Sequence, residues 1–165
     1  MAIISKRIID LLQLRIKHEE FNSKVYTAMS NWLNLHAFEG ASKLWKSYAD
    51  DERGHKQWAV DYLLDLNILP IEPDEDEPQL EYKGLPNIIA LSYQREIQTT
   101  KEVQELAKAS LEEGDMLTFG LAQKYVAEQV EEIQKIQFWI DYLVSFGDSG
   151  TSLQLLDEKM GDLVE

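Results

Sequence analysis

Apolar residues recur every three or four positions along most of this chain, which is the spacing of one face of an α-helix. The pattern runs through four long segments and one short segment, and residues that favour turns separate them. Strand-like alternation of apolar and polar residues does not stand out. We therefore predict five helices, over about 5–35, 40–67, 87–113, 116–146 and 152–163.

The residues between the predicted helices are of types that cap helices or form turns and loops. Ser5 is a candidate N-cap of the first helix, and Glu39-Gly40 indicates the first turn. Residues 68–86 contain all four prolines and an acidic run, as expected of a long crossover loop. Gly114 and Asp115 then predict a C-cap followed by an N-cap. The whole chain, 1–165, is predicted to be one all-α domain: a four-helix bundle with a long crossover loop between the second and third helices and a short fifth helix at the C-terminal end.

Composition narrows the possible partners. Sixteen basic and thirty acidic residues give a formal charge of -14, which disfavours nucleic acid and anionic membrane surfaces and attracts cations. Without cysteine there is no disulfide, zinc knuckle or thiolate iron site, and this suits a cytoplasmic protein. No run approaches the roughly 20 apolar residues of a membrane span. We expect no signal peptide, because charges interrupt the apolar N-terminal residues.

Polar residues interrupt all four long apolar stripes near mid-helix. Any single acid of this kind is better explained as a solvated side chain beside the stripe, but the same interruption on four helices is not. Several acids buried at one level of a core are costly unless a cation neutralises them, and iron is the cation we expect. The interrupting residues are Glu19, Glu52, His55, Glu96, Gln129 and Glu132.

The spacing within this set suits metal binding. Glu52 and His55 lie three residues apart, on one helix face, so Glu52 could bridge two ions while His55 binds one of them. Hard carboxylate oxygens suit both Fe(II) and Fe(III). The pattern is typical of di-iron carboxylate bundles, although the fourth helix offers Gln129-x-x-Glu132 in place of a second Glu-x-x-His.

The sequence resembles the bacterial non-haem ferritins over nearly its whole length, and a ferritin-like fold is implied. The motifs that carry the resemblance are Glu19, Tyr26, MSNW at 29–32, H-x-F-E-G at 36–40, DE-x-x-H at 51–55, Glu96, Y-x-x-EQ-x-EE at 125–132 and Ser149-Gly150.

The resemblance implies two irons per subunit, bound at a ferroxidase centre. The first would lie on Glu19, Glu52 and His55. The second would lie on Glu52, Glu96 and Glu132, with Gln129 close by. A third, adjacent iron site would use Asp51, Glu128, Glu131 and Glu132, and Tyr26 matches a tyrosine beside the centre.

Two positions depart from patterns known in the wider family. Asp51 stands where the family commonly has Glu. Arg53 stands where a haem-ligating Met would be, so no haem is expected.

The function implied by the resemblance is oxidation of Fe(II) by O₂ or H₂O₂ and storage of Fe(III) mineral inside a homo-oligomeric cage of twenty-four subunits. The apolar face of the 152–163 helix is expected to contact neighbouring copies around a four-fold axis. The three-fold channel of animal ferritins would fall at Phe119 and Ala122, which are apolar. The alternative is a di-iron oxidase or peroxidase of the rubrerythrin type without bulk storage, although such proteins usually carry a cysteine iron site.

Overall fold

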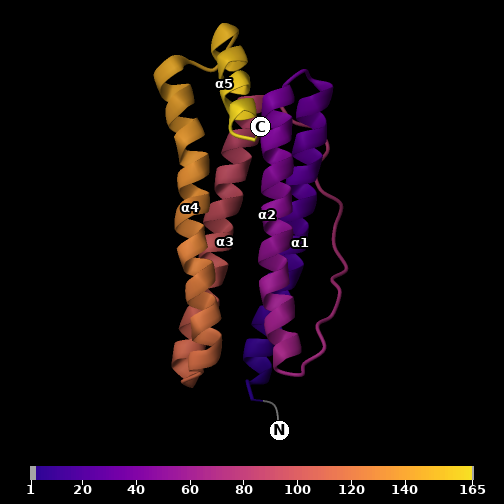
Figure 1. Ribbon diagram of the computed structural model, residues 1–165, viewed down its shortest axis with the longest axis vertical. Helices are drawn as coiled ribbons and strands as arrows, with labels where there is room; N and C mark the ends of the chain where they lie inside the picture. The colour runs from indigo at the N-terminus through magenta and orange to yellow at the C-terminus, as the bar shows by residue number, and fades with distance from the viewer. Residues whose placement is uncertain (1–2, 165) are drawn as a thin grey trace.

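The computed structural model describes residues 3–164, and within them the predicted all-α fold with five helices is confirmed (Figure 1). Each helix boundary lies within about two residues of its predicted position. The helices are α1 (Lys6–Leu35), α2 (Glu39–Asp65), α3 (Leu85–Glu113), α4 (Met116–Phe146) and α5 (Thr151–Asp162).

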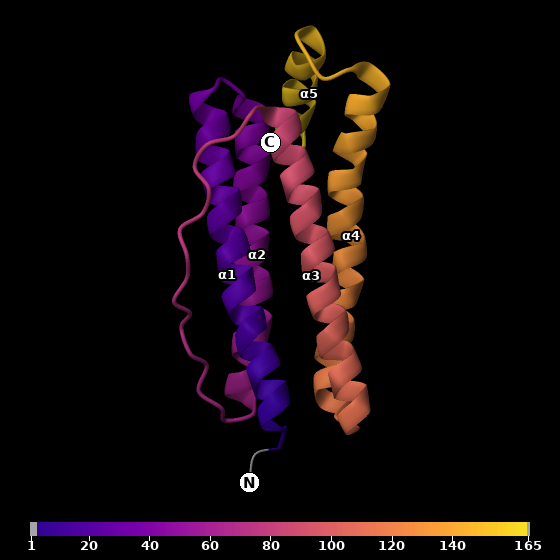
Figure 2. The same cartoon turned by 180° about the vertical axis from the view of Figure 1, so that it is seen from behind.

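The long loop between α2 and α3 determines the topology. α1 and α2 form one antiparallel hairpin, and α3 and α4 form the other (Figure 1). The loop runs along the outside of α1 from one end of the bundle to the other, so α3 begins at the end where α2 also begins (Figures 1 and 2). α2 and α3 are therefore parallel, and all four helices present their middles at the same level.

The predicted caps are present. The Ser5 hydroxyl accepts the Ile8 N–H at 3.2 Å, and the Asp115 carboxylate accepts the Thr118 N–H at 3.0 Å. Gly114 ends α3 in the left-handed conformation, with φ of 68°. The first turn differs from the prediction: α2 already begins at Glu39, and the chain reverses at residues 36–38, where Ala37 has a positive φ.

The apolar core is divided into two clusters along the bundle axis. One cluster, near the α5 end, includes Trp45, Ile88 and Trp139. The other, near the N-terminus, includes Leu12, Leu63 and Leu106. Between them lie the buried polar residues of the four long helices, among them Glu19, Glu52, Glu96 and Glu132. The acids thus form a layer across the bundle, with close-packed apolar side chains above and below it.

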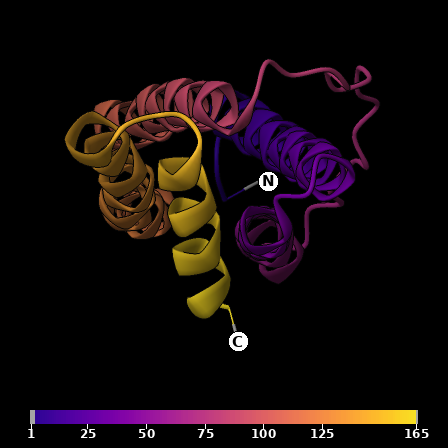
Figure 3. The same ribbon diagram turned by 90° about the horizontal axis from the view of Figure 1, so that it is seen from above.

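α5 crosses the end of the bundle and packs mainly against the start of α2 (Figures 1 and 3). Leu156 and Met160 are fully buried in the core of their own chain, which the sequence did not lead us to expect. The Asp157 carboxylate accepts the N–H groups of Gly40 and Ala41, at 3.2 and 2.7 Å, and so caps α2 from a distant segment. Only the outer side of α5, with Leu155 and Leu163, remains exposed.

Among residues 3–164, no helix is both long and apolar enough to span a lipid bilayer.

The α2–α5 contact generates the first prediction. A Cβ at Gly40 would lie 1.9 Å from the Asp157 carbonyl oxygen, whereas a Cβ at Gly54 would have no heavy atom within 4 Å. Gly40→Ala should therefore separate the helices and lower the free energy of unfolding by roughly 1–3 kcal/mol, as overpacking does. Gly54→Ala on the same helix should raise it by about 0.5–1 kcal/mol. Thermal or denaturant unfolding of both variants tests this, and equal stabilities would contradict it.

Candidate metal centre

The four long helices bring their mid-helix acids together in the predicted layer. Each acid projects inward from a stripe of core residues, so the packing that buries the stripe also buries the acid. The side chains are almost inaccessible, with relative exposures of 1% for Glu19, 2% for Glu52, 6% for His55, 1% for Glu96, 5% for Gln129 and 4% for Glu132. The predicted residues are thus all present at one level of the core.

Glu19, Glu52 and His55 form the first group that could hold a metal ion. Each offers one ligand atom, and these atoms lie within 4.8 Å of one another. His55 Nδ1 lies 3.9 Å from Glu52 Oε2. Glu19 Oε2 is buried and lacks a hydrogen-bond partner within the part of the chain that is described. An unsatisfied buried carboxylate oxygen is expensive, and a cation bound between these three residues would satisfy it.

Glu96 lies on the α3 side of the layer, with its oxygens held by neighbours. Tyr26 donates its hydroxyl proton to Glu96 Oε1 through a short hydrogen bond. The Gln129 amide donates to Glu96 Oε2 and to the Glu96 carbonyl oxygen, both at 3.2 Å. Tyr26 and Gln129 therefore orient Glu96 and stabilise its charged form.

His55, Glu128 and Glu132 form a second group whose ligand atoms lie within 4.8 Å of one another. His55 Nε2 lies 3.4 Å from Glu128 Oε1. His55 thus belongs to both groups and joins them. Asp51, which approaches Lys135 of α4, and Glu131 are both exposed, and neither belongs to either group.

The sequence did not lead us to expect the buried cation in this layer. The Arg15 guanidinium is 3% exposed; its Nε lies 2.7 Å from Glu19 Oε1 and its Nη1 lies 2.8 Å from Glu102 Oε2. His18 Nδ1 also contacts Glu102 Oε2, at 2.7 Å. Arg15 follows Leu12 at helical spacing, but Glu102 is distant in sequence, so only the fold reveals the pair.

Two further polar residues approach the acids. Lys135 Nζ lies 2.7 Å from Glu132 Oε1 and 3.9 Å from Asp51 Oδ2. The Asn22 amide donates to Glu52 Oε2 at 3.3 Å and to Thr99 Oγ1 at 3.2 Å. The spacing of three residues between Glu132 and Lys135 could have indicated their pairing. Asn22 had no comparable signal, because its partners lie on other helices.

Burial controls the protonation of the layer when no metal is bound. Loss of hydration, together with the negative charges of Glu96 and Glu132, raises the pKa of Glu52 to about 7, against the lowering effect of its hydrogen bond from Asn22. Burial likewise raises the pKa of Glu132 to about 7, against the opposing effect of Lys135. Burial also raises the pKa of Glu19 well above its usual value. The layer therefore holds protons near neutral pH, and a metal ion would displace them.

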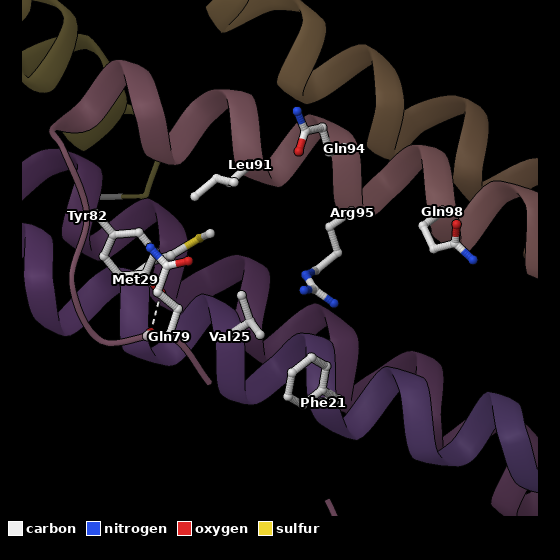
Figure 4. Close-up of a pocket in the computed structure, with 9 residues that line it drawn as sticks. All are labelled: Phe21, Val25, Met29, Gln79, Tyr82, Leu91, Gln94, Arg95 and Gln98. Atoms are coloured by element: carbon white, nitrogen blue, oxygen red, sulfur yellow. Dashed lines mark hydrogen bonds between the residues drawn. The ribbon is translucent and has the colours of Figure 1, made fainter. Parts of the chain in front are cut away.

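A pocket between α1, α3 and the crossover loop lies beside the layer but contains none of its acids (Figure 4). Phe21, Val25 and Met29 of α1 face side chains of α3 across it (Figure 4). Arg95 lies 5.0 Å over the Phe21 ring and donates to Asn22 Oδ1 at 3.1 Å, and Asn22 in turn contacts Glu52. Arg95 and Asn22 thus separate this pocket from the carboxylates.

The layer is suited to binding small divalent cations that change oxidation state. Its four carboxylates and one imidazole are hard or borderline ligands, as iron requires. Glu52 shares one group with Glu19 and His55, and it also lies close enough to Glu96 and Glu132 for their charges to raise its pKa. Cysteine is absent from the sequence, which leaves oxygen and nitrogen as the available donors.

Comparison with known proteins agrees with this geometry. The family model described as Ferritin-like domain matches residues 9–144. A bacterial non-heme ferritin of Escherichia coli O157:H7 is 33% identical over 98% of both chains. A probable bacterial non-heme ferritin-like protein of Haemophilus influenzae is 31% identical, also over 98% of both chains. An open pore ferritin from Archaeoglobus fulgidus superposes with a TM-score of 0.93, at 25% identity over 98% of both chains.

The raised pKa values generate the second prediction. An acid whose pKa is higher in the folded than in the unfolded state stabilises the fold fully only below its unfolded pKa. For Glu52 and Glu132 this contribution is lost between pH 4.5, the usual pKa of a glutamate, and about pH 7. The metal-free protein should therefore lose stability, by roughly 3 kcal/mol for each acid, as pH rises through this window.

The measurement is the melting temperature of the metal-free protein against pH, with and without Zn(II). Zn(II) should stabilise the protein more at pH 8 than at pH 5, since it replaces protons. In Glu52→Gln, the melting temperature of the metal-free protein should depend less on pH than in the parent. A rise in metal-free stability between pH 5 and 7 would contradict the assignment of these acids as buried and protonated.

Proposed function

The chain belongs to the ferritin family, and from this premise we propose that it oxidises Fe(II) at the carboxylate layer and stores the Fe(III) as mineral. The observation that carries the proposal is the joined pair of metal-capable groups, Glu19–Glu52–His55 and His55–Glu128–Glu132, buried at mid-bundle. Glu96 completes the layer from α3. A location in the cytoplasm suits the absence of cysteine and is part of the same proposal.

The chain supplies binding and positioning to the reaction. Two Fe(II) ions bind, the first on Glu19, Glu52 and His55 and the second on Glu52, Glu96 and Glu132, with Gln129 adjacent. Each Fe(II) gives one electron to O₂ or H₂O₂, so the pair supplies the two electrons that either oxidant needs to reach peroxide or water. The anionic ligands favour the Fe(III) product, because its higher charge interacts more strongly with carboxylates.

Tyr26 and Gln129 hold Glu96 in position for the second iron. Their hydrogen bonds leave Glu96 little freedom to reorient, so the site is organised before metal arrives. The burial of Tyr26, beside the negative charge of Glu96, raises the tyrosine pKa well above its usual value, and the phenol keeps its proton. Asp51, Glu128, Glu131 and Glu132 on the α2–α4 face would receive a third iron adjacent to the pair.

Storage requires a closed container, and we propose the twenty-four-subunit cage typical of ferritins, without haem. The outer side of α5 supports this. Leu155 and Leu163 are 51% and 64% exposed although the opposite side of the helix is fully buried. A short helix that covers the end of the bundle and still exposes leucines is suited to contacts with other copies.

The third prediction concerns the shared ligand. Glu52→Ala should abolish fast Fe(II) oxidation, since the carboxylate serves both irons, while the assembled protein keeps its mass. Asp50→Ala, two residues away on the exposed face of the same helix, is the matched control and should oxidise Fe(II) at the parent rate. Stopped-flow absorbance of Fe(III) formation measures both. Parent-like oxidation by Glu52→Ala would show that this layer is not the reaction site.

The fourth prediction concerns assembly. Leu155→Lys should weaken contacts between copies, because each buried leucine contributes roughly 1.5–3 kcal/mol and the change recurs in every subunit. Gln154→Lys, also exposed on α5, adds the same charge and should assemble normally. Light scattering should detect lower-mass species only for Leu155→Lys, with helical content preserved. Normal assembly of both variants would overturn the role assigned to the outer side of α5.

A further inference from the structure

A lysine lies among the carboxylates of the α2–α4 face. Lys135 follows Glu132 by three residues on α4, and its ammonium lies 2.7 Å from Glu132 Oε1. It also lies 3.9 Å from Asp51 Oδ2 on α2, so it joins the two helices. Glu132 is 5% exposed at its side chain, whereas Asp51 is 45% exposed. Lys135 thus spans from the buried layer to the surface.

The ammonium contacts a carboxylate that metal binding would need. Glu132 belongs to the metal-capable group with His55 and Glu128, whose ligand atoms lie within 4.8 Å of one another. A carboxylate oxygen that accepts a close hydrogen bond from an ammonium is a weaker metal ligand, and a divalent ion bound nearby would repel the ammonium. Lys135 and a cation on this face therefore compete for the Glu132 carboxylate.

The properties of Lys135 allow its ammonium to move away from Glu132 into solvent. An ammonium is a compact, strongly hydrated charge on a flexible stem of four carbons. The Lys135 side chain is 38% exposed, so it has a route to water. The contrast is Arg15, whose guanidinium is 3% exposed between Glu19 and Glu102 and has no comparable route.

We propose that Lys135 is a tethered, displaceable cation that competes with iron for Glu132 and Asp51. A third ion binds across Asp51, Glu128 and Glu132 Oε1, the oxygen that Lys135 contacts, only when the ammonium moves into solvent, whereas Glu132 Oε2 serves the second iron of the pair. The third site consequently has low affinity, and it returns to the ammonium-bound state when its metal departs. This inference rests on the proposed function, because it assumes that two ions occupy the inner layer first.

Anaerobic calorimetric titration of the assembled, metal-free protein with Fe(II) tests the proposal without any oxidation reaction. The parent protein should bind two ions per chain tightly and a third more weakly. Lys135→Met should strengthen binding of the third ion about tenfold, a coupling typical of competing ligands. Lys135→Arg retains a cation and should keep the third site weak. Lys135→Gln replaces Met if the Met variant does not fold.

Lys108→Met is the matched control, because it removes an exposed lysine that pairs with Glu112 far from the layer. It should titrate like the parent. Asp51→Asn in the Lys135→Met background should reverse the gain at the third ion. A third ion bound equally by the parent and by Lys135→Met or Lys135→Gln would overturn the role of Lys135. A parent that fails to bind two ions would instead overturn the proposed function.

Discussion

Burial of four carboxylates at one level of the bundle is the constraint on which the rest of the structure depends. An isolated carboxylate in a protein interior loses several kcal/mol of hydration, and like charges nearby increase that loss. The chain offsets part of it with Arg15 on Glu19, with Lys135 on Glu132 and with hydrogen bonds to Glu96. Protons or metal ions must offset the rest of this desolvation cost. The folded chain therefore favours the binding of cations at this position.

The topology brings the acids of the four long helices to the same level of the bundle. The crossover loop returns along the bundle so that α2 and α3 run parallel, and the mid-points of all four helices coincide (Figure 2). Two apolar clusters, one on each side, then exclude water from the acids and supply the stability that the polar layer does not. A bundle with its hydrophobic residues spread evenly would be more stable, but it would lack this buried set of side chains that could hold a metal ion.

Periodicity in the sequence was sufficient for the helices and for the residues of the layer. A helical stripe is a local property, so Glu19, Glu52, Glu96 and Glu132 could be assigned to core faces from spacing alone. The exact face that α3 buries was less clear from spacing, because Ser92 and Thr99 are buried there while the adjacent Tyr93 and Thr100 are only partly covered. Contacts between segments far apart in sequence were not predictable. The Arg15–Glu102 pair and the packing of Leu156 against α2 depend on how the hairpins meet.

The unpredicted polar residues Arg15, Asn22 and Lys135 share a physical role, since each supplies charge or a hydrogen bond to an acid that spacing had already identified. A charged residue near the edge of an apolar stripe is ambiguous in sequence: it can reach outward to water or inward to a partner. The side chain turns inward only where the fold provides an opposite charge, as Glu102 does for Arg15. In a bundle built around buried acids, the position of each cation therefore determines which carboxylate oxygens stay free for metal. Arg15 pairs with Oε1 of Glu19 and leaves Oε2 without a hydrogen-bond partner among the described residues. Glu19 can therefore offer Oε2 to a metal ion held together with Glu52 and His55.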